Sequence, residues 1–372
     1  MKYLYLFLFI SLQFGLNAQY NFKDSKELDC TSIKSQANTG TCWSFATASF
    51  IESELMRQGK GEHDLSEMYV VRNIYKDKAR NYLLRQGKAN FSQGSLSHDL
   101  INIIKQGGVM PESIYSGLLE GEKAHNHSEM EAGLKGFLDG VLSTKKLSKK
   151  WPMAMDAILD TYIGEAPEEF EYKGKQYTPQ SLAQSLSINP ADYVSLTSFT
   201  HHPFGESFVL EIPDNYSNGR FMNIPIEDLM ETIDKALAEG YSVAWDGDVS
   251  EKGFDAKQGI AVLPAKPARK DLFKKPGEEI EVTQEDRQSN FESYSTTDDH
   301  LMHIIGSAED QEGNEYYIIK NSWGKISPYR GRLYMSKAYA AMKTVAIMVH
   351  KDGHVEGVLF IVELGEISPC SI

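Results

Sequence analysis

Cys42 is the residue of this sequence with the strongest potential for covalent chemistry. It opens the stretch CWSFATASFI, which contains no charged residue and is typical of a buried helix. A thiol at the start of a helix lies near free N–H groups and the positive end of the helix dipole, which favours the thiolate. Because a lone cysteine is more often a small buried hydrophobic residue, other residues must decide between the two interpretations.

A candidate oxyanion donor precedes the thiol. Gln36 lies six residues before Cys42, in the segment QANTGTCW. The small residues Thr39, Gly40 and Thr41 would allow a tight turn that folds Gln36 back toward the thiol. The side-chain amide of Gln36 and the backbone N–H of Cys42 could then stabilise a tetrahedral oxyanion, and one such donor contributes roughly 2.7 to 4 kcal/mol.

A base and its orienting residue are predicted near the other end of the chain. The runs HLMHIIGSA and EYYIIKNSWG flank a polar, glycine-containing turn, which indicates a β-hairpin. If the turn centres near Gln311 and Glu312, paired residue numbers sum to about 623, and His300 faces a residue close to Asn321. The imidazole could then take the thiol proton while the Asn carbonyl oxygen orients the ring, and Trp323 could shield this hydrogen bond from water.

His303 competes with His300 for the role of base. Positions 300 and 303 face opposite sides of a strand, so we expect His303 to be a structural histidine on the other face. Asp298 and Asp299 could raise the pKa of His300 and support an imidazolium, or they could simply form a polar entry to the strand.

The remaining histidines do not indicate a metal site. His201, His202, His125 and His127 have no carboxylate or cysteine partner at metal-ligand spacing, so we expect solvated loop residues. The sequence therefore predicts neither a bound metal nor a cofactor.

Composition and charge exclude several classes of protein. With 372 residues, 41% of them hydrophobic and 24% charged, the chain is an ordinary globular protein with a large core. Its net charge of −14 and the absence of basic runs argue against a nucleic-acid partner. Beyond the N-terminus no segment is apolar for the roughly 20 residues that a membrane span requires. Three cysteines allow at most one disulfide, and whether Cys30 and Cys370 pair stays open.

The N-terminus is typical of an export signal. Lys2 precedes the apolar run YLYLFLFISL, and the small residue Ala18 precedes Gln19 as a cleavage point. We therefore expect a signal peptide at 1–18 and a mature chain from Gln19 that works in the periplasm or outside the cell.

The predicted elements form two groups. We expect helices from Cys42 to Gly59, from the N-cap Ser66 to Gly87, and over 96–106. A mostly helical insertion over about 120–190 includes a helix capped by Thr178.

From about residue 191 the chain changes to short β-branched and aromatic runs, and 264–290 is expected to be a polar surface loop. Helices followed by strands predict an α+β fold of two lobes, with the site in the cleft between them.

The segments that carry these residues resemble a known family. QANTGTCWSFATAS is similar to the active-site Cys segment of papain-like cysteine peptidases, and HLMHIIGSA with YYIIKNSWG is similar to their His and Asn segments. The resemblance covers nearly all of residues 30–350. It implies a papain-like peptidase domain over 19–372 with Cys42 as nucleophile, Gln36 in the oxyanion hole, His300 as base and Asn321 as orienting residue.

The resemblance also implies supporting and substrate-binding residues. Trp43 and Trp323 would support the site. Gly94 and Ser95 fall where the family holds the substrate in an extended pose through backbone groups. Thr39 stands where the family's Cys signature has a second cysteine, so that disulfide is absent.

Spacing separates the subfamilies. The papain pattern places the His and Asn roughly 130 to 150 residues after the Cys, whereas here His300 follows Cys42 by 258 residues and Asn321 by 279. The 23 residues between Gln19 and Cys42 leave no room for an inhibitory propeptide. Both features resemble the bleomycin hydrolase and aminopeptidase C branch, whose members are typically hexameric.

The predicted function is peptide hydrolysis, and three modes stay open. An aminopeptidase is preferred because of the branch. An endopeptidase is the first alternative, because the tail HVEGVLFIVELGEISPCSI does not resemble the usual end of this branch, which limits the enzyme to free N-termini. A catalytically silent papain-fold binding protein is the second.

Overall fold

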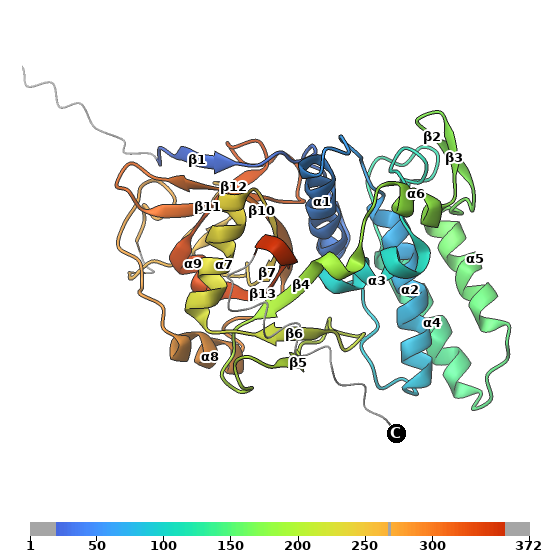
Figure 1. Cartoon of the computed structure of the whole chain (residues 1–372). Coiled ribbons are helices and arrows are strands. Elements are labelled where there is room, and N and C mark those ends of the chain that lie inside the picture. Colours follow the sequence, from blue (N-terminus) through green and yellow to red (C-terminus); the bar gives the residue numbers. More distant parts are fainter. Residues whose placement is uncertain (1–19, 267–268, 354–372) are drawn as a thin grey trace, which may run out of the picture.

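The computed structural model describes residues 20–266 and 269–353, and these form two adjoining lobes (Figure 1). One lobe is helical, and the other is built around a large sheet. The α+β class with two lobes is therefore confirmed. The predicted signal peptide and Cys370 lie outside the described residues.

Within the described ranges the chain forms nine α-helices. They are α1 (Cys42–Arg57), α2 (Glu67–Leu84), α3 (Ser97–Gly107), α4 (Ser128–Ser143), α5 (Trp151–Ile163), α6 (Pro179–Ser185), α7 (Ile226–Glu239), α8 (Gln284–Glu292) and α9 (Lys337–Lys343).

Most strands belong to one sheet in the order β5-β6-β4-β13-β7-β10-β11-β12-β9-β8, with β1 added to β10. Their bounds are β1 (Lys23–Glu27), β4 (Tyr193–Thr197), β5 (Ser207–Val209), β6 (Arg220–Asn223), β7 (Val243–Gly247), β8 (Phe254–Asp255), β9 (Ile260–Ala261), β10 (His300–Glu309), β11 (Glu315–Lys320), β12 (Arg332–Ser336) and β13 (Thr344–His350). A separate hairpin joins β2 (Phe170–Tyr172) to β3 (Lys175–Tyr177).

The helix signals of the first third of the chain are confirmed. The Ser66 hydroxyl accepts a hydrogen bond from the backbone N–H of Tyr69 and caps α2, and Gly59 and Gly87 follow the ends of α1 and α2 with positive φ. The Thr178 hydroxyl caps α6 in the same way as Ser66 caps α2. Side chains on every face of α1 are buried, as expected of a segment that opens without a charge.

Three helices of the β lobe were not predicted, namely α7, α8 and the short α9. α8 occupies 284–292, and most of it lies in the segment 264–290 that was predicted to be a polar loop. It was missed because its sequence carries too few apolar residues to show a periodic stripe. It begins with a capping box between Thr283 and Asp286, which was a readable signal. α7 has an apolar face, including Leu229, Ile233 and Leu237, that packs into the core of the β lobe.

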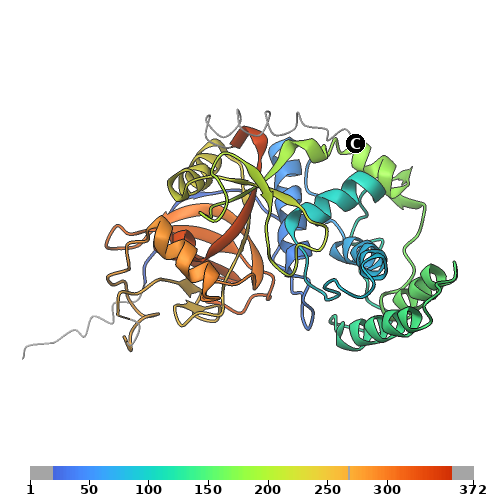
Figure 2. The same ribbon diagram turned by 90° about the horizontal axis from the view of Figure 1, so that it is seen from below.

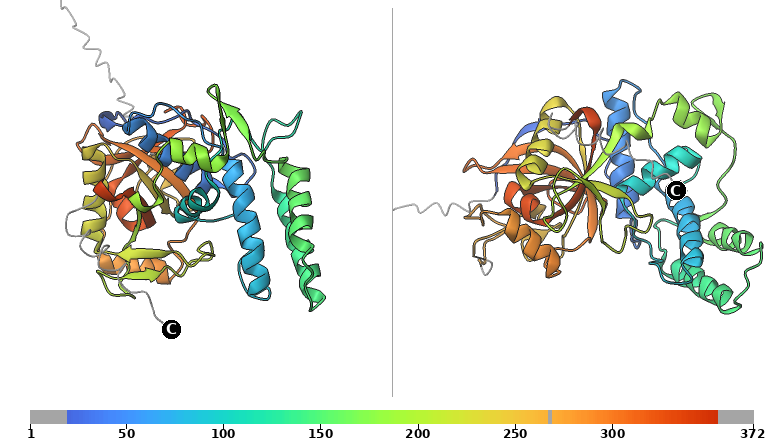
Figure 3. Two further views of the ribbon diagram at one scale, coloured as in Figure 1. Left: turned by 45° about the vertical axis from the view of Figure 1, so that its right-hand side comes forward. Right: turned by 60° about the horizontal axis from the view of Figure 1, so that its bottom comes forward.

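The segment 120–190 contains α4, α5, the β2–β3 hairpin and α6. In Figure 3 α4 and α5 stand beside α2, and the views in Figures 1 and 2 agree on this arrangement. The apolar residues Leu134 and Leu138 of α4 and Leu159 of α5 are fully buried in the core of the helical lobe. No helix in the described part of the chain is long and apolar enough to cross a membrane.

The hairpin of β10 and β11 has nearly the predicted register. His303 pairs with Lys320 and Ile304 with Ile319, which gives the sum of 623. The register shifts by one residue between Ile304 and Gly306, so the pairs nearer the turn sum to 624. Such a bulge inserts one extra residue into a strand, and the spacing of apolar residues does not reveal it.

Leu134→Ala should lower the free energy of unfolding by about 2 to 5 kcal/mol, because it removes a fully buried side chain and leaves a cavity. Urea denaturation followed by circular dichroism measures this change. Met153→Ala on α5 is the control, because Met153 is 73% exposed and its truncation should change stability by less than about 0.5 kcal/mol. Equal effects of the two substitutions would contradict the packing described here.

Candidate active site

Cys42 is the first residue of α1, which packs against β10. Its side chain is 8% exposed, and the backbone N–H of Leu301 donates a hydrogen bond to its sulfur. Leu301 directly follows His300 in β10. The structure thus places the thiol against the strand that carries the predicted base, although 258 residues separate Cys42 from His300 in the sequence.

His300 and Asn321 form the predicted pair. Nε2 of His300 and Oδ1 of Asn321 are 2.8 Å apart. The backbone N–H of Ser322 donates to the same Oδ1 at 2.7 Å, which identifies this atom as the oxygen. Nε2 of His300 must therefore carry the proton and donate it to Asn321. This tautomer leaves Nδ1 as the nitrogen that can accept the proton of a thiol.

Trp323 covers this pair. Its ring centre lies 4.5 Å from that of His300, at an interplanar angle of 32°. The ring of Phe254 packs against the indole of Trp323 in an edge-to-face arrangement, with the ring centroids 6.1 Å apart. The indole therefore packs on the imidazole of this pair, and its role as a shield of the hydrogen bond from water stays a prediction.

Gln36 is held by both lobes. Its side-chain Nε2 donates to the carbonyl oxygen of Thr39 at 2.7 Å, so the loop folds back as predicted. The Ser322 hydroxyl donates to Oε1 of Gln36 at 2.6 Å, and the backbone N–H of Gln36 donates to the carbonyl of Ser322 at 2.8 Å. Because Oε1 is occupied by a donor, the amide group is oriented, and its second N–H stays available for an oxyanion.

The charge state of the thiol differs from the prediction. Burial raises the pKa of Cys42 to about 12, and the charges of Asp298 and Asp246 act in the same direction. The hydrogen bond from Leu301 lowers the pKa of the thiol, but burial outweighs it. The expectation that the helix terminus favours a thiolate is therefore wrong for the resting state, because burial penalises the charged form.

The imidazole is neutral as well. Burial lowers the pKa of His300 to about 4, while Asn321 and the charge of Asp299 raise it by less. Of the two interpretations left open for the neighbouring acids, Asp299 does support the imidazolium, and Asp298 does not contribute to the pKa of His300. A neutral thiol beside a neutral imidazole fits transfer of the proton as the sulfur attacks.

Gln93 links the oxyanion loop to the helical lobe. Its Oε1 accepts the backbone N–H of Gly40 at 2.7 Å, and its carbonyl accepts the indole N–H of Trp43 at 2.9 Å. Its Nε2 donates to Glu131 on α4 at 2.7 Å. Gln93 therefore connects Trp43 and the oxyanion loop to a helix of the 120–190 segment, and the supporting role of Trp43 stays a prediction.

The next two residues, Gly94 and Ser95, were predicted to hold substrate. The carbonyl oxygen of Gly94 already accepts a hydrogen bond from the buried Lys78 ammonium. The Ser95 hydroxyl is buried and donates to Asp99, in the first turn of α3, at 2.7 Å. Substrate binding by their backbone groups stays a prediction.

A buried charge network lies behind the orienting Asn. The Lys320 ammonium donates to the carbonyl and the hydroxyl of Thr31, both at 2.9 Å. The Thr31 hydroxyl in turn donates to Glu52 of α1. Lys320 directly precedes Asn321, so this network fixes the backbone that presents the Asn side chain.

The other histidines divide into correct and wrong predictions. His303 is structural, as predicted: its Nδ1 lies 2.8 Å from the Ser49 hydroxyl, and its ring packs against Phe50. His127 was expected in solvent, but it is buried, and burial lowers its pKa to about 4.

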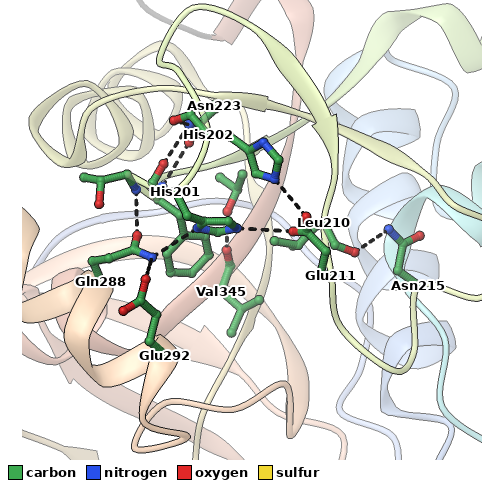
Figure 4. Close-up of polar contacts among 12 residues, drawn as sticks. His201, His202, Leu210, Glu211, Asn215, Asn223, Gln288, Glu292 and Val345 are labelled. Carbon is green, nitrogen blue, oxygen red and sulfur yellow. Dashed lines mark hydrogen bonds and ion pairs between the residues drawn. The ribbon is translucent and has the colours of Figure 1, made fainter.

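His201 and His202 do have a carboxylate partner, contrary to the prediction. Figure 4 shows both rings directed at Glu211, with Nε2–Oε distances of 3.2 and 2.8 Å. The three ligand atoms lie within 4.8 Å of one another, close enough for a metal ion. However, the backbone N–H of Thr200 donates to Oε1 of Gln288, which leaves Nε2 of Gln288 to donate to Nδ1 of His201. Because Nδ1 of His201 accepts this hydrogen bond, the proton of the ring lies on Nε2, the nitrogen that faces Glu211. Hydrogen bonding thus accounts for this cluster without an ion.

Residues that sequence reasoning missed are mostly positioning residues. Ser322 had a signal, because it lies inside the motif NSWG next to Asn321. Gln93 had none, because its partners Gly40, Trp43 and Glu131 are distant in the sequence. Lys78 had none, because its partners are backbone carbonyls, which carry no side-chain signal.

The family comparisons agree with this geometry. Residues 155–367 match the Peptidase C1-like family, and residues 16–156 match the papain family of cysteine proteases. The chain is 25% identical to aminopeptidase G of Lactobacillus delbrueckii subsp. lactis over 374 residues, which cover 88% of this chain and 82% of that protein.

Two further proteins are similar over most of their length. Mitochondrial cysteine proteinase 1 of Saccharomyces cerevisiae is 22% identical over 361 residues, which cover 84% of this chain and 73% of that one. The crystal structure of PepW from Lactobacillus rhamnosis HN001 superposes with a TM-score of 0.74 at 20% identity, covering 93% of this chain and 86% of that one, and so has the same fold. The match to the Peptidase C1-like family spans more than half of this chain. The chain therefore belongs to the Peptidase C1-like family of papain-like cysteine peptidases, in the bleomycin hydrolase and aminopeptidase C branch that its Cys-to-His spacing predicts.

Proposed function

We propose that this protein is a cysteine aminopeptidase that hydrolyses peptides with Cys42, His300 and Asn321. The observation that carries the proposal is the hydrogen bond to the Cys42 sulfur from the backbone N–H of Leu301, the residue that follows His300, together with the bond between Nε2 of His300 and Asn321. This arrangement leaves Nδ1 of His300 as the proton acceptor.

The reaction follows from these positions. The Cys42 sulfur attacks the peptide carbonyl as its proton passes to Nδ1 of His300. The second amide N–H of Gln36 and the backbone N–H of Cys42 stabilise the oxyanion. His300 then protonates the leaving amine, which gives a thioester and releases the first product. Water deprotonated by His300 hydrolyses the thioester and restores the thiol.

The exopeptidase mode rests on the relatives. Aminopeptidases G, E and C of Lactobacillus species match 84% to 88% of the chain. The alternative endopeptidase mode rests on the unusual tail, which lies outside the described residues. The silent alternative is disfavoured, because competent residues fill all four catalytic positions.

Cys42→Ala should reduce peptidase activity by at least about 10³-fold, because it removes the nucleophile. Fluorogenic peptide hydrolysis measures the loss, and iodoacetamide labelling followed by mass spectrometry should modify Cys42 in the folded wild-type protein. Cys30→Ala is the matched control and should retain activity, since Cys30 lies against the apolar cluster of the β lobe that includes Tyr20 and Ile305. Full activity in Cys42→Ala would refute the mechanism.

A peptide coumarinamide with a free N-terminus should be cleaved at least about tenfold faster than the same peptide carrying an N-acetyl group. The reason is that an aminopeptidase recognises the substrate's ammonium, which acetylation removes. Initial rates at equal substrate concentration provide the comparison. Equal rates would replace the aminopeptidase assignment with the endopeptidase alternative.

Asp298→Asn should lower the pKa of the Cys42 thiol, because the Asp298 carboxylate raises it. The pKa of Asp298 is itself about 7, so its charge is present above that pH and lost below it. Alkylation by iodoacetamide should therefore be roughly threefold to tenfold faster in the variant above pH 7, for a change of about 0.5 to 1 pKa unit. The two rates should converge below pH 6.

The control for this measurement is Asp228→Asn on α7, which changes the same functional group at a position that does not affect the pKa of Cys42. Superimposable pH profiles for Asp298→Asn and wild type would contradict the proposed electrostatic effect of Asp298 on the thiol.

A further inference from the structure

One glutamine holds the residues on both sides of the thiol. Oε1 of Gln93 accepts the backbone N–H of Gly40, which lies two positions before Cys42, at 2.7 Å. The carbonyl oxygen of Gln93 accepts the indole N–H of Trp43, the residue directly after Cys42, at 2.9 Å. Only Thr41 and Cys42 lie between these two contacts. Gln93 therefore restrains the short stretch of backbone that carries the N–H of Cys42.

That N–H is one of the two donors of the proposed oxyanion hole. Cys42 is the first residue of α1, and the first N–H groups of a helix have no acceptor within the helix. An oxyanion donor is effective only when it points at the position where the oxygen develops charge. A rotation of the peptide plane between Thr41 and Cys42 would turn the N–H away from this position. The contact of Gly40 with Gln93 opposes such a rotation.

Glu131 orients the side-chain amide of Gln93. Nε2 of Gln93 donates to Oε2 of Glu131, in the first turn of α4, at 2.7 Å. A carboxylate only accepts hydrogen bonds, so the amide nitrogen must face Glu131 and the amide oxygen must face Gly40. Without Glu131 the amide could turn over and present its nitrogen to the N–H of Gly40. The two residues also pack closely, since a Cβ on Gly40 would lie 3.1 Å from the Cβ of Gln93.

Further contacts join the loop before the thiol to the residues before α4. Asn38 donates its backbone N–H to the carbonyl of His125 at 3.0 Å, and its own carbonyl accepts the N–H of His127 at 3.3 Å. The neighbouring Ala37 has a φ of +52°, a left-handed conformation that a residue with a Cβ keeps only when its surroundings enforce it. The loop and the start of α4 are therefore held together along their backbones, which lets Glu131 act on the loop through Gln93.

We propose that Glu131, acting through Gln93, is a positioning residue for the oxyanion hole. It directs the N–H of Cys42 by fixing Gly40, as Asn321 directs the ring of His300. The helical insertion thereby contributes to catalysis through hydrogen bonds to the loop that precedes the nucleophile. The inference rests on the proposed peptidase function and adds to it the residues that place one oxyanion donor.

Glu131→Ala should lower kcat for Leu-coumarinamide at least about tenfold and change KM less than about twofold, because the oxyanion forms only after the substrate is bound. Glu129→Ala is the matched control, since it removes the same side chain at an exposed position in the same turn of α4. It should change neither constant more than about twofold. Circular dichroism and thermal unfolding verify that both variants are folded. Equal kcat values for the two variants would overturn the proposal.

Alkylation of Cys42 separates positioning of the oxyanion donor from general damage to the site. In the reaction with iodoacetamide the sulfur displaces iodide from a methylene carbon, so no oxyanion forms and the rate reports the thiol and its base. The alkylation rate of Glu131→Ala should therefore stay within about twofold of the wild-type rate. An alkylation rate that falls as far as kcat would mean that the substitution disturbs the thiol itself, and would overturn the assignment.

An exchange of the two side chains tests the hydrogen bonds directly. Gln93→Glu alone places two carboxylates against each other and should lower kcat at least about tenfold. When it is combined with Glu131→Gln, the carboxylate at position 93 accepts both the N–H of Gly40 and the amide at position 131. The kcat of this double variant should return to within about threefold of the wild-type value. A double variant as slow as Gln93→Glu would contradict the proposal.

Hydrogen–deuterium exchange keeps this inference separate from the peptidase function. The amide hydrogen of Gly40 should exchange at least about tenfold faster in Glu131→Ala than in the wild type, and at the wild-type rate in Glu129→Ala. Mass spectrometry with electron-transfer fragmentation resolves this amide. Faster exchange in a protein that hydrolyses no peptide would support the positioning by Glu131 and refute only the peptidase function. An unchanged exchange rate of Gly40 would refute the positioning role whether or not the protein is a peptidase.

Discussion

The structure depends on one contact between the lobes, where the segment before Cys42 lies against the segment after Asn321. The backbone N–H of Gln36 binds the carbonyl of Ser322, the Ser322 hydroxyl binds Oε1 of Gln36, and the N–H of Gly324 binds the carbonyl of Lys34. Each hydrogen bond adds only about 0.5 to 1.5 kcal/mol. Together they place the oxyanion donor of one lobe and the orienting Asn of the other in a single frame. The thiol and the base therefore meet at the seam between the lobes, although neither lobe contains both.

Much of this site could be predicted, because its parts lie in short local patterns. A charge-free helix start located Cys42, and a polar turn between two apolar runs placed His300 opposite Asn321. The alternation of a strand was enough to separate His300 from His303. These inferences hold because helix starts and hairpins are determined within about twenty residues. The bulge between Ile304 and Gly306 could not be predicted, because an extra residue in a strand leaves the apolar pattern on either side intact.

What could not be predicted depends on distant packing. The pKa of Cys42 follows burial by β10 and by carboxylates from three separate segments, so the helix dipole alone gave the wrong direction. Glu211 reaches His201 and His202 through a loop whose path no local pattern indicates. Gln93 joins Gly40, Trp43 and Glu131, residues spread over 92 positions of the chain.

The distance in sequence between the two halves of the site determines when the site can exist. Gln36 and Cys42 are synthesised early, whereas His300, Asn321 and Ser322 belong to the last quarter of the chain, and β1 has to wait for β10 before it can join the sheet. Contacts of such high sequence separation close late in folding, because the long intervening loop must be ordered first. In a partly synthesised or partly folded molecule, the Cys42 thiol therefore lacks its base His300, and the Gln36 amide lacks the hydrogen bond from Ser322. A hydrolytic site divided in this way between the two ends of the chain is incomplete until both ends are in place.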